Sequence, residues 1–490
     1  MANQRIHRLV TPARVLASCA FAFFVAGCLS SCGSSSGSST VTDPQAAVPQ
    51  TYFAAAVSGS YAGSSISDSE YLSTYTVDDT KNTFAQSIYT FGSGDQKGPQ
   101  LDYSGTSAAL SRGLAELNIS YSNSLYGSSV NNGTGISYDP PLGGNWFVEL
   151  PDQAGGVASL KGMPFVPLVA ANQCPQSSKA STFEFVSIPT YIGPNQAGYT
   201  GGIQNWTPDI DTAYGIVQVS AKGNAVTFSN IEQFTASGTR VASYPDISGN
   251  PPAISSKTGS CSSTFYGNTI SIPGEVVITN PGVGETISSS AVVGIGPSGL
   301  LLENNGETSN LVSNASLTGY QPFLGSGTGA MGIPQPSSPI DVLDLTGAQF
   351  VGVTYGGGTS SSDWTSVLTS AGFPGKPAGC PSGTFKAPLF GGDYPNNDPT
   401  QALAGTAAGY GNCNLVIDLG AQDASKNGLF PHATVHMNAG FAGKANNPEH
   451  SFPAAVIAGQ LNGKYALFAI GVDANGSPQQ AWGIYLFQTK

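Results

Sequence analysis

The chain has 490 residues, of which 40% are hydrophobic and 9% are charged, and its formal net charge is −12. This acidic balance, with no basic run after the N-terminal segment, argues against nucleic-acid binding. The 63 Gly and 33 Pro disfavour long helices and favour strands joined by turns.

The N-terminal segment has the pattern of an export signal. Arg5, Arg8 and Arg14 precede an apolar run from Val15 to Gly27. The run is shorter than the ~20 apolar residues that a membrane-spanning helix needs, and it is typical of a secretory signal. We therefore expect residues 1–27 to be a signal peptide.

The apolar run ends in Val25-Ala26-Gly27-Cys28, which resembles the lipobox of bacterial lipoproteins. In that family the Cys is acylated and becomes the mature N-terminus. Cys28 is the expected lipidation site, with Cys32 as the alternative. Neither Cys is followed by Asp, and this resemblance implies sorting to the outer membrane, where the lipid anchors the chain.

A short tether follows the expected lipid anchor. Residues 28–48 are rich in Ser and Gly, most of all in the stretch GSSSGSST from Gly33 to Thr40. Such composition is typical of a flexible linker. The acidic chain is repelled by anionic headgroups, so we expect it to meet the membrane through the lipid alone.

Residues 49–490 have the pattern of an all-β body. Alternating apolar segments recur between residues that tolerate positive φ, and four pairs of segments predict hairpins. These pairs are Tyr71–Val77 with Thr83–Phe91, Ala213–Val219 with Ala225–Phe228, Ala291–Ile295 with Leu300–Leu302, and Tyr465–Val472 with Ala481–Phe487. Short helices are expected only from Ser362 to Ser370 and within Asp398–Ala408.

These strands predict one large antiparallel body in which a sheet closes on itself, or sheets stack, so that edge strands are removed or protected. A β-propeller-like ring is the expected arrangement, closed by pairing of the first strand, near Tyr52, with the last strand. A β-sandwich or a pair of barrels is the alternative.

Four Cys lie in the expected β body. An even number of Cys in an exported chain indicates two disulfides, for which three pairings are possible. We favour the pairing with the least crossing, Cys174 with Cys261 and Cys380 with Cys413.

Two short stretches add a family resemblance. Trp146–Pro151 and Pro164–Pro175, together with the lipobox, the tether and the Gly- and Ser-rich body, resemble a family of uncharacterised lipoproteins from β-proteobacteria. The resemblance implies an envelope lipoprotein and brings no catalytic residues with it.

Three His of the body lie close together in the sequence, at His432, His436 and His450. On a strand, the first two share a face but lie too far apart to bind one ion without a bend. We therefore expect packed or surface histidines. We find no nucleophile elbow of the serine-hydrolase type in the body.

Two other groups of residues are candidate ligand sites. Asp393, Asn396 and Asp398 cluster oxygen ligands of the kind that calcium prefers, and no other cofactor is expected. Trp206 precedes Asp209 and Asp211 in a loop-like setting, where an aromatic ring and carboxylates would hold a sugar.

These features predict a lipid-anchored binding or scaffold module of the cell envelope, whose partner is an envelope glycan or protein. The alternative is a periplasmic or surface glycan hydrolase. Such an enzyme would use two carboxylates, drawn from Asp209, Asp211, Glu184 and Glu149.

Overall fold

The fold is described from a computed structural model. It describes residues 50–54, 71–78, 81–90, 101–109, 114–123, 131–138, 145–148, 166–169, 174–175, 179–187, 190–192, 209–234, 237–242, 257–264, 267–276, 287–309, 329–358, 365–372, 380–381, 383–394, 410–443, 449–476 and 480–489.

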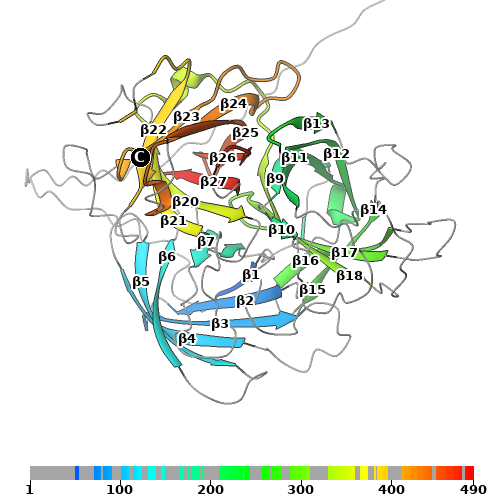
Figure 1. The fold of residues 1–490 in the computed structure, drawn as a ribbon. Helices are drawn as coiled ribbons and strands as arrows, with labels where there is room; N and C mark the ends of the chain where they lie inside the picture. The colour runs from blue at the N-terminus through cyan, green and yellow to red at the C-terminus, as the bar shows by residue number, and fades with distance from the viewer. Residues whose placement is uncertain are drawn as a thin grey trace, which may run out of the picture. The chain divides into compact units, whose positions relative to one another are not determined.

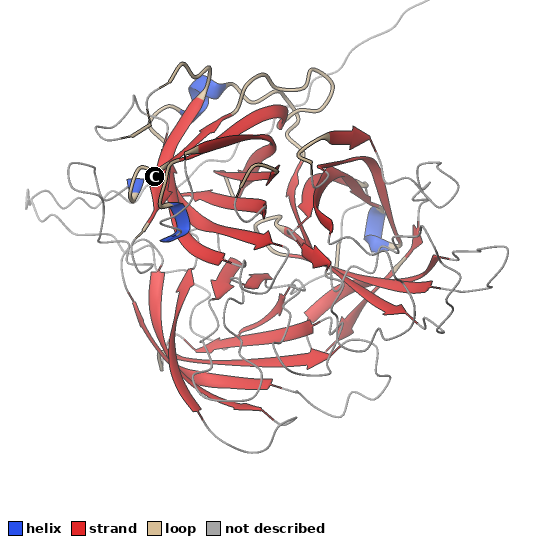
Figure 2. Ribbon diagram, in the orientation of Figure 1, coloured by secondary structure: helices blue, strands red, loops and turns tan. Residues whose placement is uncertain are grey.

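The described residues form an all-β, antiparallel protein, as the sequence predicts (Figure 2). Between the strands lie short 3-10 turns, among them η1 (Ala221–Gly223), η2 (Val342–Leu345) and η6 (Phe441–Gly443).

The first group of strands is a closed barrel in which each strand pairs with the next in sequence. Pairing of Phe53 with Val169 joins the first strand to the last. The strands, coloured blue to cyan in Figure 1, are β1 (Gln50–Ala54), β2 (Tyr71–Asp78), β3 (Thr83–Thr90), β4 (Leu101–Ala109), β5 (Leu114–Asn123), β6 (Asn131–Tyr138), β7 (Asn145–Val148) and β8 (Val166–Val169).

The second group forms a sheet in the order β13-β12-β11-β9-β19-β18-β17-β16-β15, with β10 paired to β11. It curls back on itself, because β14 pairs with β12 while the neighbouring β15 pairs with β16. Its strands are β9 (Ser181–Ser187), β10 (Thr190–Ile192), β11 (Asp209–Val219), β12 (Ala225–Phe234), β13 (Arg240–Ala242), β14 (Lys257–Thr258), β15 (Ser260–Thr264), β16 (Gly267–Val276), β17 (Ile287–Ile295), β18 (Leu301–Ser309) and β19 (Gly329–Pro334).

The third group is a second closed barrel, in which Phe350 pairs with Gln488 to join the first and last strands. We call it the C-terminal barrel. Its strands, coloured yellow to red in Figure 1, are β20 (Gln349–Gly358), β21 (Thr365–Gly372), β22 (Pro388–Asp393), β23 (Leu415–Asp418), β24 (Leu429–Met437), β25 (His450–Leu461), β26 (Lys464–Asp473) and β27 (Gln480–Gln488).

The barrel alternative is therefore confirmed, and the expectation of a propeller-like ring is wrong. The ring was expected to close between the first and last strands of the whole body. Instead β27 pairs with β20, and β1 pairs with β8. Each barrel closes within its own segment and so leaves no open edge.

The four predicted hairpins are confirmed as β2–β3, β11–β12, β17–β18 and β26–β27. In the first three, Asn82, Lys222 and Gly299 supply the positive φ that a tight turn requires. The helix expected from Ser362 to Ser370 is wrong, since Thr365–Gly372 forms β21 and pairs with strands on both sides. The other expected helix, Asp398–Ala408, lies outside the described residues.

The C-terminal barrel has a solid interior. Alternate side chains of its strands point inward and form one apolar cluster, which includes Phe350, Leu415, Phe452, Trp482 and Ile484. Trp482 is 1% exposed. Side chains therefore fill the space in which a larger barrel could hold a ligand.

The outward faces of the C-terminal barrel and of the second sheet share another apolar cluster. Val186, Tyr214 and Met331 of the second sheet pack with Val353 and Phe468 of the barrel. We call this contact the sheet–barrel interface. The inward face of the second sheet has its own core, which includes Phe183, Phe185 and Val217.

Both predicted disulfides are present. Cys174 is bonded to Cys261 across a sequence separation of 87, and Cys380 to Cys413 across 33. The second bond belongs to a small apolar cluster with Tyr410 that covers part of the outer face of the barrel.

Candidate functional site

Several residues predicted as sites lie outside the described residues: Cys28, Cys32, Glu149, Trp206, Asn396 and Asp398. The backbone of Asp209 and Asp211 lies at the start of β11, where these residues pair with Ile192 and Thr190 of β10. Among the predicted carboxylates, Asp393 and Glu184 are the two whose side chains the structure describes.

The carboxylate of Asp393 is a structural anchor at the end of β22. Its Oδ1 accepts hydrogen bonds of 2.8 Å from the side-chain amides of Asn412 and Asn414. Its Oδ2 accepts a bond of 2.7 Å from the backbone N–H of Ala442. These three donors account for the burial of the carboxylate, which is 4% exposed. The calcium site that would include Asn396 and Asp398 stays a prediction.

Glu184 points into the sheet–barrel interface because side chains alternate along β9. Phe183 and Phe185 enter the core of the second sheet, so Glu184 and Val186 face the other way. Glu184 is 2% exposed. A glutamate at so buried a position requires a partner or a neutral carboxyl.

The surroundings of Glu184 favour the neutral form. Its Oε1 lies 3.5 Å from the amide nitrogen of Gln335, and among the residues that the structure describes its Oε2 has no hydrogen-bond partner. Burial raises the pKa of Glu184 to about 8, with a smaller upward effect from Asp423, while Gln335 and Lys426 lower it in part. The carboxyl is therefore protonated at neutral pH.

The loop between β23 and β24 covers this carboxyl. Gln422 Oε1 accepts bonds of 3.0 Å from the N–H groups of Ile340 and Gly428, and Asn427 donates to the carbonyl of Pro336 at 3.1 Å. Gly428 has a φ of +93°, and a Cβ there would meet the Ala458 carbonyl and Glu184 Oε2. Only glycine satisfies both requirements.

The same loop carries a second carboxyl group, that of Asp423, which is ionised whereas Glu184 is protonated. The hydroxyl and N–H of Ser425 donate to Asp423 Oδ1 at 2.7 Å each, and they lower the pKa of Asp423. One protonated and one ionised carboxyl near each other is the arrangement that acid–base catalysis uses. The sequence analysis named Glu184 but missed Asp423, because nothing local indicates that this loop packs against β9.

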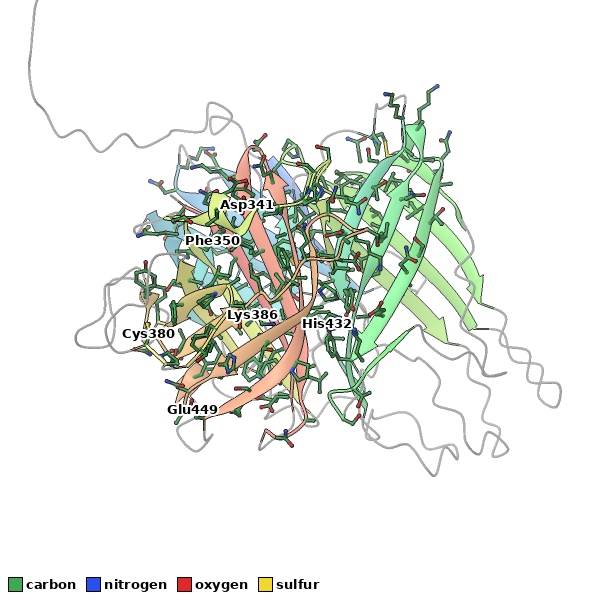
Figure 3. All side chains as sticks on the ribbon, turned by 90° about the horizontal axis from the view of Figure 1, so that it is seen from above. Asp341, Phe350, Cys380, Lys386, His432 and Glu449 are labelled. Carbon is green, nitrogen blue, oxygen red and sulfur yellow. A yellow bond between two sulfur atoms is a disulfide. The ribbon has the colours of Figure 1, made fainter. Side chains whose placement is uncertain are left out.

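A polar network spans another part of the sheet–barrel interface. Arg240 Nε lies 3.3 Å from Glu232 Oε2, which also accepts a hydrogen bond from the hydroxyl of Tyr214. Across the interface, Arg240 donates to the carbonyl of Pro431 at 2.6 Å and lies 3.4 Å from His432 Nε2. Figure 3 shows His432 where the barrel meets the green strands of the second sheet.

That contact depends on an irregularity in β24. The register with β25 shifts between Phe430 and Ala433, so Pro431 and His432 are left out of the ladder. A carbonyl released in this way is available to a donor from another element.

The other two histidines have different surroundings. His450 is packed, with Nε2 2.9 Å from Asp473 Oδ2 and its ring stacked on Phe452. His436 lies further along β24, and its Nδ1 is 2.5 Å from the hydroxyl of Ser451. The sequence analysis missed this pair because it depends on the register of β24 with β25.

Two kinds of feature are absent from the described residues. No group of three or more His, Cys, Asp or Glu is placed so that it could hold a metal ion. In the same residues, no helix has the length and apolar character to span a bilayer.

Comparison with known proteins gave no match, either to a protein-family model or to a curated protein. The resemblance to β-proteobacterial lipoproteins therefore stays a prediction, and function is inferred from the residues themselves.

Proposed function

We propose that this chain is a lipid-anchored protein of the bacterial cell envelope whose β body acts as a binding or scaffold module for an envelope glycan or protein. The lipobox at Cys28 and the tether of residues 28–48 support the anchor. The stretch from Gly33 to Thr40 alone reaches about 15 Å by random-coil scaling, so the tether keeps the body close to the membrane.

The observation that carries the binding role is the solid interior of the C-terminal barrel. Trp482, Phe350 and Phe452 belong to the cluster that fills it, so a partner of this barrel must be recognised on its outside or at its loops. A rigid sheet scaffold that presents loops is a common arrangement for binding proteins.

The anchor is tested by labelling with radioactive palmitate in the native host. We expect Cys28→Ala to abolish the label, because the acylated thiol is lost, whereas Cys32→Ala keeps it. Loss of the label only in Cys32→Ala would move the anchor to the alternative Cys, and full labelling of the double variant Cys28→Ala/Cys32→Ala would contradict lipidation at either one.

Binding is tested by thermal shift of residues 41–490, folded with both disulfides, against envelope glycans and calcium. A ligand at 100 times its Kd stabilises the folded state by about 2.7 kcal/mol. We expect a glycan-specific rise in the melting temperature, and we expect Trp206→Ala to remove this rise. Leu343→Ala is the control, because Leu343 is an exposed apolar residue elsewhere, on η2. A rise with calcium that a chelator reverses would support the site that includes Asp393. If no compound raises the melting temperature, the small-ligand role is contradicted and a protein is the expected partner.

A glycan hydrolase is the second candidate, and the protonated Glu184 together with the ionised Asp423, which lies on the loop that covers it, favours this function. Because Glu184 is 2% exposed, a substrate would reach it only after the sheet–barrel interface opens. A hydrolase would lose turnover in Glu184→Gln and keep its affinity for the glycan. A binding module would show no turnover in either form.

A further inference from the structure

Three polar side chains lie on the outer face of neighbouring strands in the C-terminal barrel. Val435 and Phe452 point into the barrel, so His436 and Ser451, the next residues along β24 and β25, point outward. These two residues are direct cross-strand partners. On β23, Asp418 is placed outward in the same way and lies diagonally from His436.

The geometry of the central pair is that of a hydroxyl beside a base. Ser451 Oγ lies 2.5 Å from His436 Nδ1, and Ser451 is exposed. The edge-on ring of Phe385 lies 5.0 Å from the imidazole, between ring centroids, and restricts its rotation. A nucleophile within hydrogen-bond reach of a base that a third group holds in place is the signature of an activated nucleophile.

The charge state of the imidazole suits a base. Burial lowers the pKa of His436, while the carboxylates of Asp418 and Glu449 raise it in part. Asp418 is fixed by the backbone N–H groups of Lys386 and Ala387, which donate to it at 3.1 and 2.8 Å. At neutral pH the imidazole is uncharged and has a nitrogen free to take a proton. Figure 3 labels Lys386 and Glu449 on the barrel.

We propose that Ser451 is a surface nucleophile, activated by His436, that accepts the acyl group of an activated carboxylic ester. Ser451 Oγ forms a bond to the carbonyl carbon as its proton passes to His436 Nδ1. The ester C–O bond then breaks, the leaving alcohol takes the proton from His436, and the acyl group stays on Ser451. This chemistry goes beyond the binding role proposed above and does not depend on it.

The test treats the full chain with p-nitrophenyl acetate and measures acetylation of each serine by peptide mass spectrometry. Ser425 is the internal control, because it is exposed but its hydroxyl donates to Asp423 instead of an imidazole. We expect Ser451 to react at least about tenfold faster than Ser425. His436→Gln should slow Ser451 by about a hundredfold, within the range of general-base catalysis. Ser451→Ala should remove the product, and Ser425→Ala should leave it unchanged.

The pH profile separates activation from mere exposure. The rate at Ser451 should rise through a midpoint below the ordinary His pKa of 6.5 and be flat above about pH 7. Three results would overturn the proposal: equal reaction at Ser451 and Ser425, no change in a folded His436→Gln variant, or a rate that follows hydroxide throughout. Thermal melting of each variant checks the fold.

Discussion

Replacement of Glu184 by Gln is expected to remove most of the fall in stability that the wild-type protein shows between about pH 4.5 and pH 8. The pKa of Glu184 rises from 4.5 to about 8 on folding. Across this range the folded state holds a proton that the unfolded state has released. The free energy of unfolding therefore falls as pH rises, by at most ~1.4 kcal/mol per pH unit.

The total loss attributable to Glu184 is about 5 kcal/mol, and it is complete above pH 8, where both states are ionised. Glu184→Gln keeps the shape of the side chain but cannot ionise, so its stability should equal that of the wild type near pH 4.5 and exceed it near pH 8. Urea unfolding at several pH values measures the difference.

The matched control is Asp344→Asn, which removes an exposed carboxyl on η2, outside the sheet–barrel interface. This variant should keep the wild-type pH dependence. If Glu184→Gln and the wild type fall in parallel from pH 4.5 to 8, Glu184 is not the buried acid that sets the slope.

Removal of the Cys174–Cys261 disulfide is expected to destabilise the protein by roughly 4 to 5 kcal/mol. The bond closes a long loop of the unfolded chain, with a sequence separation of 87, and chain-entropy scaling gives this magnitude. Cys261 also packs against the core of the second sheet. The double variant Cys174→Ala/Cys261→Ala should unfold at a lower urea concentration.

The Cys380–Cys413 bond provides the comparison. Its sequence separation of 33 predicts a smaller loss of stability, somewhat under 4 kcal/mol, in the variant Cys380→Ala/Cys413→Ala. Reductant should destabilise each double variant only through the bond that it keeps. An unfolding midpoint that stays unchanged in Cys174→Ala/Cys261→Ala would show that this bond does not restrict the unfolded chain.

The elements that the sequence predicted well are those set by neighbouring residues. Hairpins such as β2–β3 depend on alternation and on a turn residue such as Asn82, and both can be seen in a short stretch. The strand β21 was missed because Thr365–Gly372 gains its conformation from strands on either side. Closure within each segment depends on long-range pairs, such as Phe350 with Gln488, which no local pattern specifies.

The candidate site shows the same division. Glu184 could be named as a candidate acid, but its burial depends on a loop that comes from the C-terminal barrel. Within this loop the N–H of Gly428 donates a hydrogen bond to Gln422 Oε1. The partnership of His436 with Ser451 depends on the register of two strands, and a shift by one residue would place the two side chains on different faces.

The way the C-terminal barrel closes also determines the order in which it can fold. Neighbours in sequence pair from β20 to β27, so each hairpin can form soon after its residues emerge during synthesis. The ladder between β20 and β27 is the exception, since β20 has to wait for Gln480–Gln488. Until then both β20 and β26 have an unpaired edge, and a chain that stops before β27 would expose two sites for aggregation.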